Sequence, residues 1–279
     1  MSSIQRYPGL SPVSAQRIRD TRRDETLDQV IEETPVALVY NGVSYAVMMA
    51  TPCDLEDFAL GFALGEGIVA RAQEFELVDC LRNEHGVSLQ ALIPHARFEA
   101  LEGRKRNLAG RSGCGLCGVE SLIEAVRPVP RVQPAAPIEP ALIESTLIAR
   151  GLRELARQQP LNERSGGVHA AGYAHAGGIL VREDVGRHNA LDKLIGALAR
   201  DADASASAAW RAQAGFLAIT SRASYEIVHK AATAGIAMVA AISAPTSLAI
   251  ELADETGVTL IAFARGDAMN VYTHRERLS

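Results

Sequence analysis

The pattern of apolar and polar positions predicts two units of different texture, the first being a set of strands packed on one helix. Its hairpin signal is Asn41-Gly42, a dipeptide typical of type I′ turns because both central residues need positive φ. Apolar residues at i, i+3, i+4 and i+7 from Leu55 to Phe62 predict a helix with one buried face, capped by Asp54. The predicted strands of this unit cover residues 26–31, 36–40, 43–50, 75–81 and 87–93.

The second unit begins near Gly166, where near-continuous apolar strands start to alternate with helices. Strands of this kind, joined by helical crossovers, indicate a parallel sheet covered on both faces. A further helix is expected over residues 140–157, after a proline-rich linker at residues 128–137. The expected strands cover residues 167–174, 178–185, 216–220, 236–243, 258–265 and 269–274, and helices are expected from Asn189 as N-cap, from Ser224 and from Ser247.

These textures divide the chain into three parts. Residues 1–20 are polar, arginine-rich and aperiodic, and we expect them to be a mobile tail. Residues 21–110 are expected to form an N-terminal α+β domain. Residues 111–279 are expected to form an α/β domain, which begins with a glycine-rich loop that holds Cys114 and Cys117.

Composition narrows the class of protein. With 48% hydrophobic and 22% charged residues, the 279-residue chain is globular and long enough to bury a core. Its net charge of −5 argues against a surface that coats nucleic acid. No apolar run reaches the roughly 18 residues that a membrane span needs, and the arginine-rich N-terminus does not suit a signal peptide. Four cysteines in such a chain point to free thiols in a reducing compartment, so we expect a cytoplasmic protein.

The sharpest chemical feature is the pair Cys114 and Cys117, which has C-x-x-C spacing and lies among glycines. Basic residues at 104–106 and Arg111 precede the pair, and a short helix is predicted to begin near Gly118. Positive charge and a helix N-terminus both lower the pKa of a thiol, so this setting favours a thiolate. The glycines leave the sulfur atoms uncovered. A mobile, ionised and exposed thiol suits transfer between two partners.

Four interpretations of this pair compete. A structural zinc site needs two more ligands, and Cys53 and Cys80 form no second C-x-x-C, which disfavours zinc within one chain but leaves a site completed across a dimer open. We expect these two cysteines to be core residues without a chemical role. A thioredoxin-like redox motif normally follows a strand, whereas this pair follows a basic loop. The other two interpretations are small residues in a glycine turn and a nucleophilic thiolate that carries sulfur.

Polar residues follow three of the buried strands, at the edge where open α/β sheets bind their ligands. Hydroxyls, glycine and arginine before helix N-termini suit an anionic ligand, because they offer free N–H groups, a positive dipole end and a fixed cation. Ser224 and Ser247 are explained more simply as N-caps. The three segments cover residues 221–224, 243–247 and 265–267.

The junction from Asp184 to Asn189 packs four ionisable or amide groups between a strand and a helix. A local Asp184–Arg187 ion pair with Asn189 as cap explains it as well as the close approach of a ligand at Gly186 does. His169 on a neighbouring strand suggests a zinc deaminase, but that chemistry needs H-x-E followed by P-C-x-x-C. Two alanines follow His169, so the zinc-binding residues of that class are missing and we predict no metal.

Several motifs of the chain resemble those of the FdhD/NarQ family. The similarity runs from about residue 30 to the C-terminus, and its longest block is too long to be a chance match. The resembling segments are Ser112–Gly118, Gly166–Ala171, Arg182–Lys193, Ser221–Glu226 and Asn270–His274.

The resemblance implies a sulfur carrier that formate dehydrogenase needs for activity. A cysteine desulfurase would pass sulfur to Cys114 as a persulfide, with Cys117 as an accessory thiol, and the sulfur would go to the molybdenum of a bis-molybdopterin guanine dinucleotide cofactor. Ala268 stands where many relatives carry a basic residue. The cofactor-binding loop of the family matches Phe263, Ala264, Arg265, Gly266, Asp267 and Ala268.

The resemblance also implies a fold and an assembly. The fold would be a three-layer α/β domain like that of cytidine deaminase, without zinc, plus a smaller N-terminal α+β domain. The assembly would be a homodimer.

Overall fold

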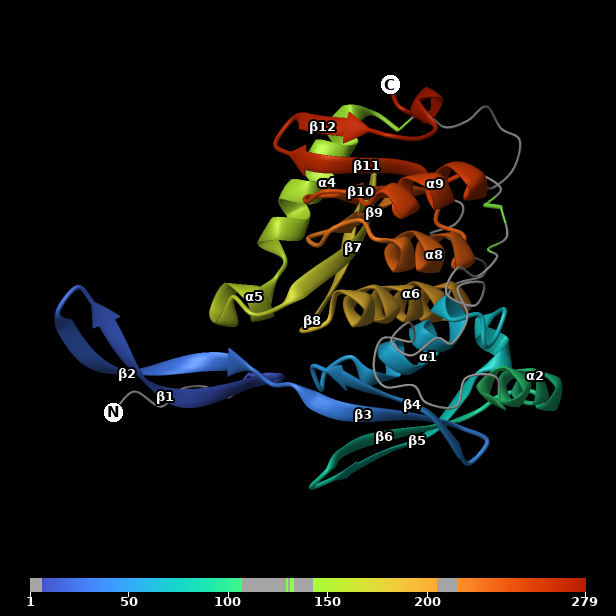
Figure 1. The fold of residues 1–279 in the computed structure, drawn as a ribbon, viewed down its shortest axis with the longest axis horizontal. Helices are drawn as coiled ribbons and strands as arrows, with labels where there is room; N and C mark the ends of the chain where they lie inside the picture. The colour runs from blue at the N-terminus through green and yellow to red at the C-terminus, as the bar shows by residue number, and fades with distance from the viewer. Residues whose placement is uncertain (1–6, 107–128, 130, 133–142, 205–214) are drawn as a thin grey trace.

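The computed structural model describes residues 7–106, 129, 131–132, 143–204 and 215–279. Within these residues the chain folds into an N-terminal unit and a larger α/β unit, and a ribbon-like hairpin extends away from both (Figure 1). None of the helices in the described part of the chain is long and apolar enough to cross a membrane.

The N-terminal unit is a four-stranded sheet in the order β4-β3-β6-β5, with helix α1 packed on it. The predicted Asn41-Gly42 turn is confirmed, because both residues have positive φ, 50° and 82°. The strands predicted over residues 75–81 and 87–93 are also confirmed as β5 and β6, which pair antiparallel, and β6 pairs in parallel with β3 at the centre of the sheet. The elements are β3 (Thr34–Tyr40), β4 (Val43–Ala50), α1 (Leu55–Gly65), a 3-10 turn η1 (Ala72–Glu74), β5 (Glu76–Asn83), β6 (Gly86–Leu92) and α2 (His95–Arg106).

The α/β unit is a six-stranded sheet in the order β12-β11-β10-β9-β7-β8. Alternate residues of its strands face opposite layers. Leu217 and Ile219 pack towards α6, α8 and α9, whereas Phe216 and Ala218 pack towards α4. Three layers result. The elements are α4 (Ser145–Arg157), α5 (Pro160–Ser165), β7 (His169–His175), β8 (Gly178–Asp184), α6 (Arg187–Ala204), β9 (Gly215–Ile219), α8 (Tyr225–Thr233), β10 (Met238–Ala241), α9 (Ser247–Thr256), β11 (Thr259–Arg265), β12 (Ala268–Val271) and η2 (Arg275–Arg277).

The prediction of a parallel sheet is right for its centre and wrong for its margins. Strands β9, β10 and β11 pair in parallel, and their crossovers contain α8 and α9. In contrast, β8 pairs antiparallel with β7, β7 with β9, and β12 with β11. Short turns join β7 to β8 and β11 to β12, and a tight turn permits only antiparallel pairing.

The expected mobile tail at residues 1–20 is wrong for most of its length. Residues Leu10–Arg19 form strand β1, which pairs antiparallel with β2 (Arg22–Ile31) along its whole length. The two strands form the hairpin that projects from the body in Figure 1. Most side chains on both strands are exposed or half-buried, so no apolar alternation marks them in the sequence.

Several local predictions also need correction. Asp54 occupies the N-cap position of α1 in a left-handed conformation without a capping side-chain bond. Helix α6 begins at Arg187, so Asn189 lies inside its first turn and is not the cap. Thr246, not Ser247, caps α9 by accepting a hydrogen bond from the Ala249 amide. Helix α4 begins at Ser145, and the part of the predicted helix before residue 143 lies outside the described residues.

The two lone cysteines are not the buried core residues that were expected. Cys53 is half-buried, and burial raises the pKa of its thiol to about 11. Cys80 is exposed on β5. Strand β5 lies at the edge of its sheet with most side chains exposed, which is why an apolar-looking sequence there does not imply burial.

Helices α1 and α6 join the two units by a close crossing at two glycines. A Cβ atom on Gly61 would overlap the backbone carbonyl of Asp192, and one on Gly196 would overlap that of Asp57. The helix backbones therefore touch directly, and any larger residue at either position would force them apart.

Candidate functional site

The cysteine pair predicted to carry the chemistry, Cys114 and Cys117, lies outside the described residues. The chain before the pair, with its basic residues at 104–106, was expected to be a loop. Its first part is instead helix α2, and residues 104–106 belong to the last turn of that helix.

The three polar segments that follow β9, β10 and β11 do come together, as predicted. Because these strands are parallel, their carboxyl ends lie at one edge of the sheet. Backbone hydrogen bonds connect the segments: Ala223 N donates to Ala244 O over 3.1 Å, Thr246 N to Ala223 O over 3.0 Å, and Phe263 N to Ser243 O over 3.1 Å. We call this region, formed by residues 220–224, 242–247 and 263–268, the strand-end edge.

The loop matched to cofactor binding lies at this edge and has an unusual backbone. Phe263 has a φ of 51° and is 43% exposed, and it lies at a register shift between Ala262 and Arg265. A left-handed conformation is costly for an aromatic residue. Strain and bulges of this kind are concentrated at functional sites, where a side chain must be aimed in a set direction.

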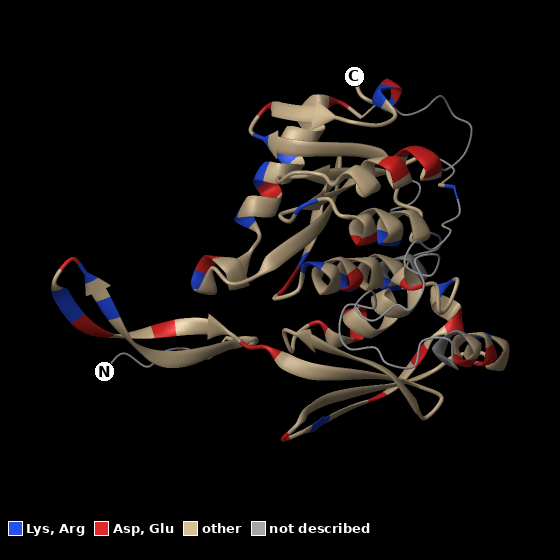
Figure 2. Ribbon diagram, in the orientation of Figure 1, with Lys and Arg blue, Asp and Glu red and all other residues tan. Residues whose placement is uncertain are grey.

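Charged groups of the same loop remain open to solvent. Arg265 donates through Nε to the Ile242 carbonyl over 3.3 Å and is otherwise exposed. Asp267 pairs with Arg153 of α4 over 3.2 Å. Figure 2 shows basic residues of α4 beside the turn between β11 and β12. Ala264 is buried in the sheet, so it anchors the loop and offers no side chain to a ligand. Gly266 is left-handed and allows the turn, and Ala268 opens β12.

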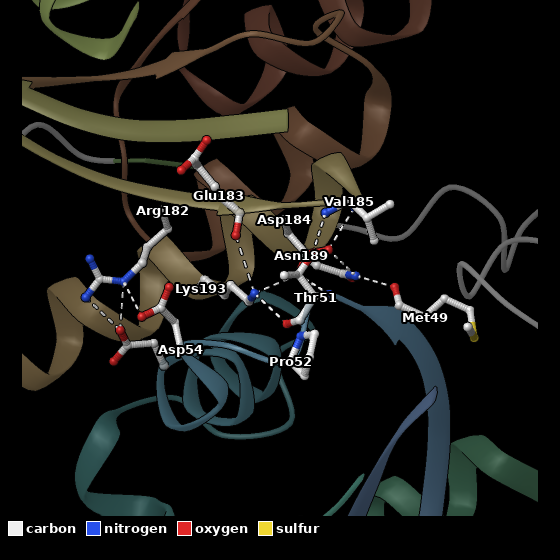
Figure 3. A network of polar contacts seen from close by, with 12 residues as sticks. Met49, Thr51, Pro52, Asp54, Arg182, Glu183, Asp184, Val185, Asn189 and Lys193 are labelled. Carbon is white, nitrogen blue, oxygen red and sulfur yellow. Dashed lines mark hydrogen bonds and ion pairs between the residues drawn. The ribbon is translucent and has the colours of Figure 1, made fainter. Parts of the chain in front are cut away.

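The junction from Asp184 to Asn189 has a different role. Asp184 and Lys193 are both fully buried and form an ion pair of 2.7 Å. The predicted Asp184–Arg187 pair is therefore wrong, and the true partner lies two turns into α6. Lys193 Nζ also donates to the Thr51 carbonyl over 3.0 Å, while Asp184 accepts from the Thr51 amide over 3.0 Å (Figure 3). A buried ion pair is tolerable when its remaining hydrogen-bonding capacity is satisfied in this way.

Neighbouring residues extend this junction onto the N-terminal unit. Asn189 Nδ2 donates to the Met49 carbonyl over 2.7 Å and to Asp184 Oδ1 over 3.0 Å. Arg182 pairs with Asp57 of α1 over 2.7 Å. A Cβ on Gly186 would lie 2.9 Å from the Asn189 amide group, so close packing against Asn189 accounts for that glycine. We call this set, Thr51, Asp184, Asn189 and Lys193, the buried clamp.

The structure brings together a third group of polar residues, Arg187, His188 and Glu226. They lie in segments that the sequence analysis named, but no cluster was predicted there. Strand β8 runs in the same direction as β9, so α6 and α8 both begin at the strand-end edge. Arg187 and His188 open α6, and Glu226 lies in the first turn of α8 with its Oε2 3.9 Å from His188 Nε2. No pattern in the sequence could have brought these residues together, because 38 positions separate His188 from Glu226.

Metal ligands are not grouped in the part of the chain that the structure describes. No three His, Cys, Asp or Glu residues there lie where they could hold a metal ion.

Fold and site together define a three-layer α/β protein that presents a strained loop with an exposed arginine, and two helix N-termini, along one edge of its sheet. The model of the FdhD/NarQ family matches residues 31–279. The chain belongs to the FdhD/NarQ family.

Curated relatives match nearly end to end. The chain is 54% identical over 273 residues to a sulfur carrier protein FdhD of Xanthomonas campestris pv. campestris, covering 97% of this chain and 93% of the relative. It is 46% identical over 282 residues to the protein of that name from Variovorax paradoxus, covering 100% and 97%. A crystal structure of a protein described as a formate dehydrogenase accessory protein, from Desulfotalea psychrophila, aligns with a TM-score of 0.71 at 25% identity, covering 98% of this chain and all of that one.

Proposed function

We propose that this protein is a sulfur carrier that takes persulfide sulfur from a cysteine desulfurase and delivers it to the molybdenum of bis-molybdopterin guanine dinucleotide for formate dehydrogenase. The observation that carries the proposal is the 54% identity to a sulfur carrier protein across almost the whole of both chains. We further propose that the protein works in the cytoplasm as a homodimer.

The sulfur would be carried by Cys114. A thiolate at Cys114 attacks the outer sulfur of the desulfurase persulfide, a new S–S bond forms on Cys114, and the desulfurase cysteine leaves as a thiolate. The basic residues and glycines that surround the pair in the sequence favour the ionised thiol that this exchange needs. Cys117 would act as an accessory thiol. A soft sulfur donor also suits delivery to a transition metal.

The cargo would be held at the strand-end edge. The cofactor carries pyrophosphate groups, and the exposed guanidinium of Arg265, beside the β11–β12 turn, supplies the fixed cation that such groups bind. Phe263 projects from the same loop, where an exposed aromatic ring is available for stacking. The loop from Phe263 to Ala268 therefore suits the cofactor-binding role that the family motif implies.

Two other functions make different predictions. A chaperone that shelters the cofactor without sulfur chemistry would tolerate loss of Cys114 and fail without Arg265. A thiol-disulfide oxidoreductase would need Cys114 and Cys117 equally and would cycle through a disulfide between them.

The test is complementation of a strain that lacks its own copy of the protein, with formate dehydrogenase activity as the readout. We expect Cys114→Ala to leave the dehydrogenase folded and inactive, and Cys80→Ala, which removes an exposed thiol of β5, to restore full activity. Full activity with Cys114→Ala would contradict the proposal. Loss of activity with Arg265→Ala, on a protein that still loads sulfur, would separate cargo binding from sulfur loading.

A further inference from the structure

Helices α1, α6 and α8 meet at a buried cluster of one lysine and two carboxylates. Lys230 Nζ of α8 donates to Asp192 Oδ1 of α6 over 2.8 Å and to its Oδ2 over 3.1 Å. The same ammonium pairs with Glu66 Oε1, at the C-cap of α1, over 2.8 Å. The side chains of Asp192, Lys230 and Glu66 are 1%, 7% and 16% exposed. We call these three residues the junction cluster, because they connect the N-terminal unit to the α/β unit.

The junction cluster is enclosed by apolar and backbone groups. The ammonium of Lys230 lies 5.1 Å from the centroid of the Phe62 ring. A Cβ atom on Gly65 would lie only 2.9 Å from Asp192 Oδ1, so the backbone of α1 packs closely against the carboxylate. An ammonium has three hydrogens, and the three contacts with carboxylate oxygens use them all. The charged groups are therefore in direct contact, without water between them.

The charges of the cluster do not balance when all three groups are ionised. One positive and two negative groups would leave an uncompensated anion inside the protein, which is costly. Glu66 also lies at the C-terminal end of α1, where the helix dipole is negative and opposes a second anion. Retaining one proton removes the imbalance. In agreement, burial raises the pKa of Asp192 to about 7, and the attraction of Lys230 only partly offsets this effect.

Three of the surrounding ionisable groups keep their charge state near neutral pH. Burial raises the pKa of Tyr40 well above its usual value, so the phenol is neutral. Burial and a neighbouring arginine lower the pKa of His188 to about 4, so its ring is uncharged above pH 6. Burial raises the pKa of Glu226, but hydrogen bonds and nearby positive charge outweigh that effect and lower it. The ionisable groups around the cluster are Tyr40, Tyr45, Asp184, Arg187, His188, Lys193 and Glu226.

We propose that the junction cluster is a pH-sensitive device, which holds α1 against α6 and α8 while it retains a proton and loosens this contact when the proton leaves. With Asp192 protonated, Lys230 and Glu66 form a balanced pair between α8 and α1. When the carboxyl of Asp192 releases its proton to water, a second buried anion forms. This anion repels Glu66 and competes with it for the same ammonium. The device acts on the contact between the two units and is independent of the proposed function.

Rising pH should loosen the junction. When the junction opens, Asp192 meets water and its pKa returns towards the ordinary value of 3.8, below the value of about 7 in the closed state. Between these two values the opened state releases the proton, so opening becomes easier as the pH rises and levels off above pH 7. His188 has the opposite dependence below pH 6.5, so the wild type is compared with a variant at each pH.

The test is amide hydrogen exchange of the full-length protein from pH 5 to pH 8, corrected for the intrinsic effect of pH on exchange. At amides of α1 and α8, the protection of the wild type relative to Asp192→Asn should fall at least about 10-fold over this range. Glu66→Gln leaves one ammonium with one carboxylate, so its fall should be smaller and end at a lower pH. The matched control Asp28→Asn, on an exposed position of β2, should behave like the wild type.

A second measurement follows the proton itself and needs only the wild type. Infrared spectra of protein with isotope-labelled aspartate should contain a protonated carboxyl band at pH 6, which disappears as the pH rises through the Asp192 pKa of about 7. The band should be absent in Asp192→Asn. A protection ratio that stays constant from pH 5 to pH 8, or no such band in the wild type, would overturn the proposal. A fall of equal size at the amides of β10, in the centre of its sheet, would also overturn it, because the effect would not be local to the junction.

Discussion

The buried clamp and the strand-end edge use similar residues for opposite purposes. In the clamp, Asp184 and Lys193 neutralise each other, and backbone groups of Thr51 complete their hydrogen bonds. At the edge, Phe263 has a strained backbone, and beside it, where α6 begins, Nε of Arg187 and Nε2 of His188 have no hydrogen-bond partner among the described residues. One motif, residues 182–193, contributes Asp184 and Lys193 to the clamp and places Arg187 and His188 beside the edge. The identity of a charged residue in this motif does not indicate its role. The role is indicated by whether its polar atoms are paired within the protein.

The largest effect is expected from a variant that breaks the buried clamp. Lys193→Met would leave Asp184 as an unpaired buried charge, and we expect a loss of about 3 to 5 kcal/mol in the free energy of unfolding. Urea denaturation monitored by circular dichroism measures this. The double variant Asp184→Leu with Lys193→Met should recover much of the loss, because it removes both charges. A loss below about 1 kcal/mol in the single variant would show that the pair is not a stabilising contact.

The next effect concerns pH and His188, which lies at the start of α6 beside the strand-end edge. Burial lowers the pKa of His188 to about 4 in the folded state, below its usual value. The unfolded chain therefore binds a proton more readily, and the stability that this residue contributes above pH 6.5 is lost as the pH falls towards 4. We expect His188→Asn to remove about 2 to 3 kcal/mol of this pH dependence. His85→Asn, at an exposed turn, is the control. Identical pH profiles for the wild type and His188→Asn would contradict the buried, neutral state.

A smaller effect tests the helix crossing that supports the clamp. Gly196→Ala would place a methyl group against the Asp57 carbonyl, and we expect a loss of about 1 to 3 kcal/mol in unfolding free energy. Gly103→Ala in α2, where nothing lies within 4 Å, should be neutral or slightly stabilising. Thermal unfolding of the two variants provides the comparison. Equal behaviour would mean that α1 and α6 are not in direct backbone contact.

The smallest effect sharpens the contrast between stability and function. Phe263→Gly removes the left-handed strain and little buried surface, so the protein should gain up to about 1 kcal/mol of stability. The same change should weaken binding of the cofactor that we propose for this loop. Denaturation and titration of one preparation check both parts. A variant that loses stability would show that Phe263 contributes to packing and is not held in a strained position for a ligand.

Much of the fold was predictable, because its strands bury one or both faces and its turns carry specific residues. Asn41-Gly42 and the apolar spacing from Leu55 identify their elements correctly. Strand β1 was missed because both faces of its hairpin are largely exposed, so burial leaves no period in the sequence. The antiparallel pairs β7–β8 and β11–β12 follow from the short turns that join their strands. These turns, at residues 175–177 and 266–267, could have been used to predict the antiparallel pairing.

The site was predictable only where topology alone decides it. Parallel strands place their carboxyl ends together, so the gathering of the three polar segments followed from the strand order. Pairing did not. Lys193 meets Thr51 across 142 positions, and the left-handed φ of Phe263 is an exception to the preference for glycine. His188 meets Glu226 of α8 across 38 positions, a contact that no local spacing encodes.

The central claim is that Cys114 accepts a sulfur atom. It is tested most directly by the intact mass of the protein after incubation with a cysteine desulfurase and cysteine, followed by mapping of the modified peptide. We predict a gain of one sulfur atom on Cys114, absent in Cys114→Ala and retained in Cys80→Ala. A loss of two hydrogen atoms across Cys114 and Cys117, or an unchanged mass, would contradict sulfur transfer.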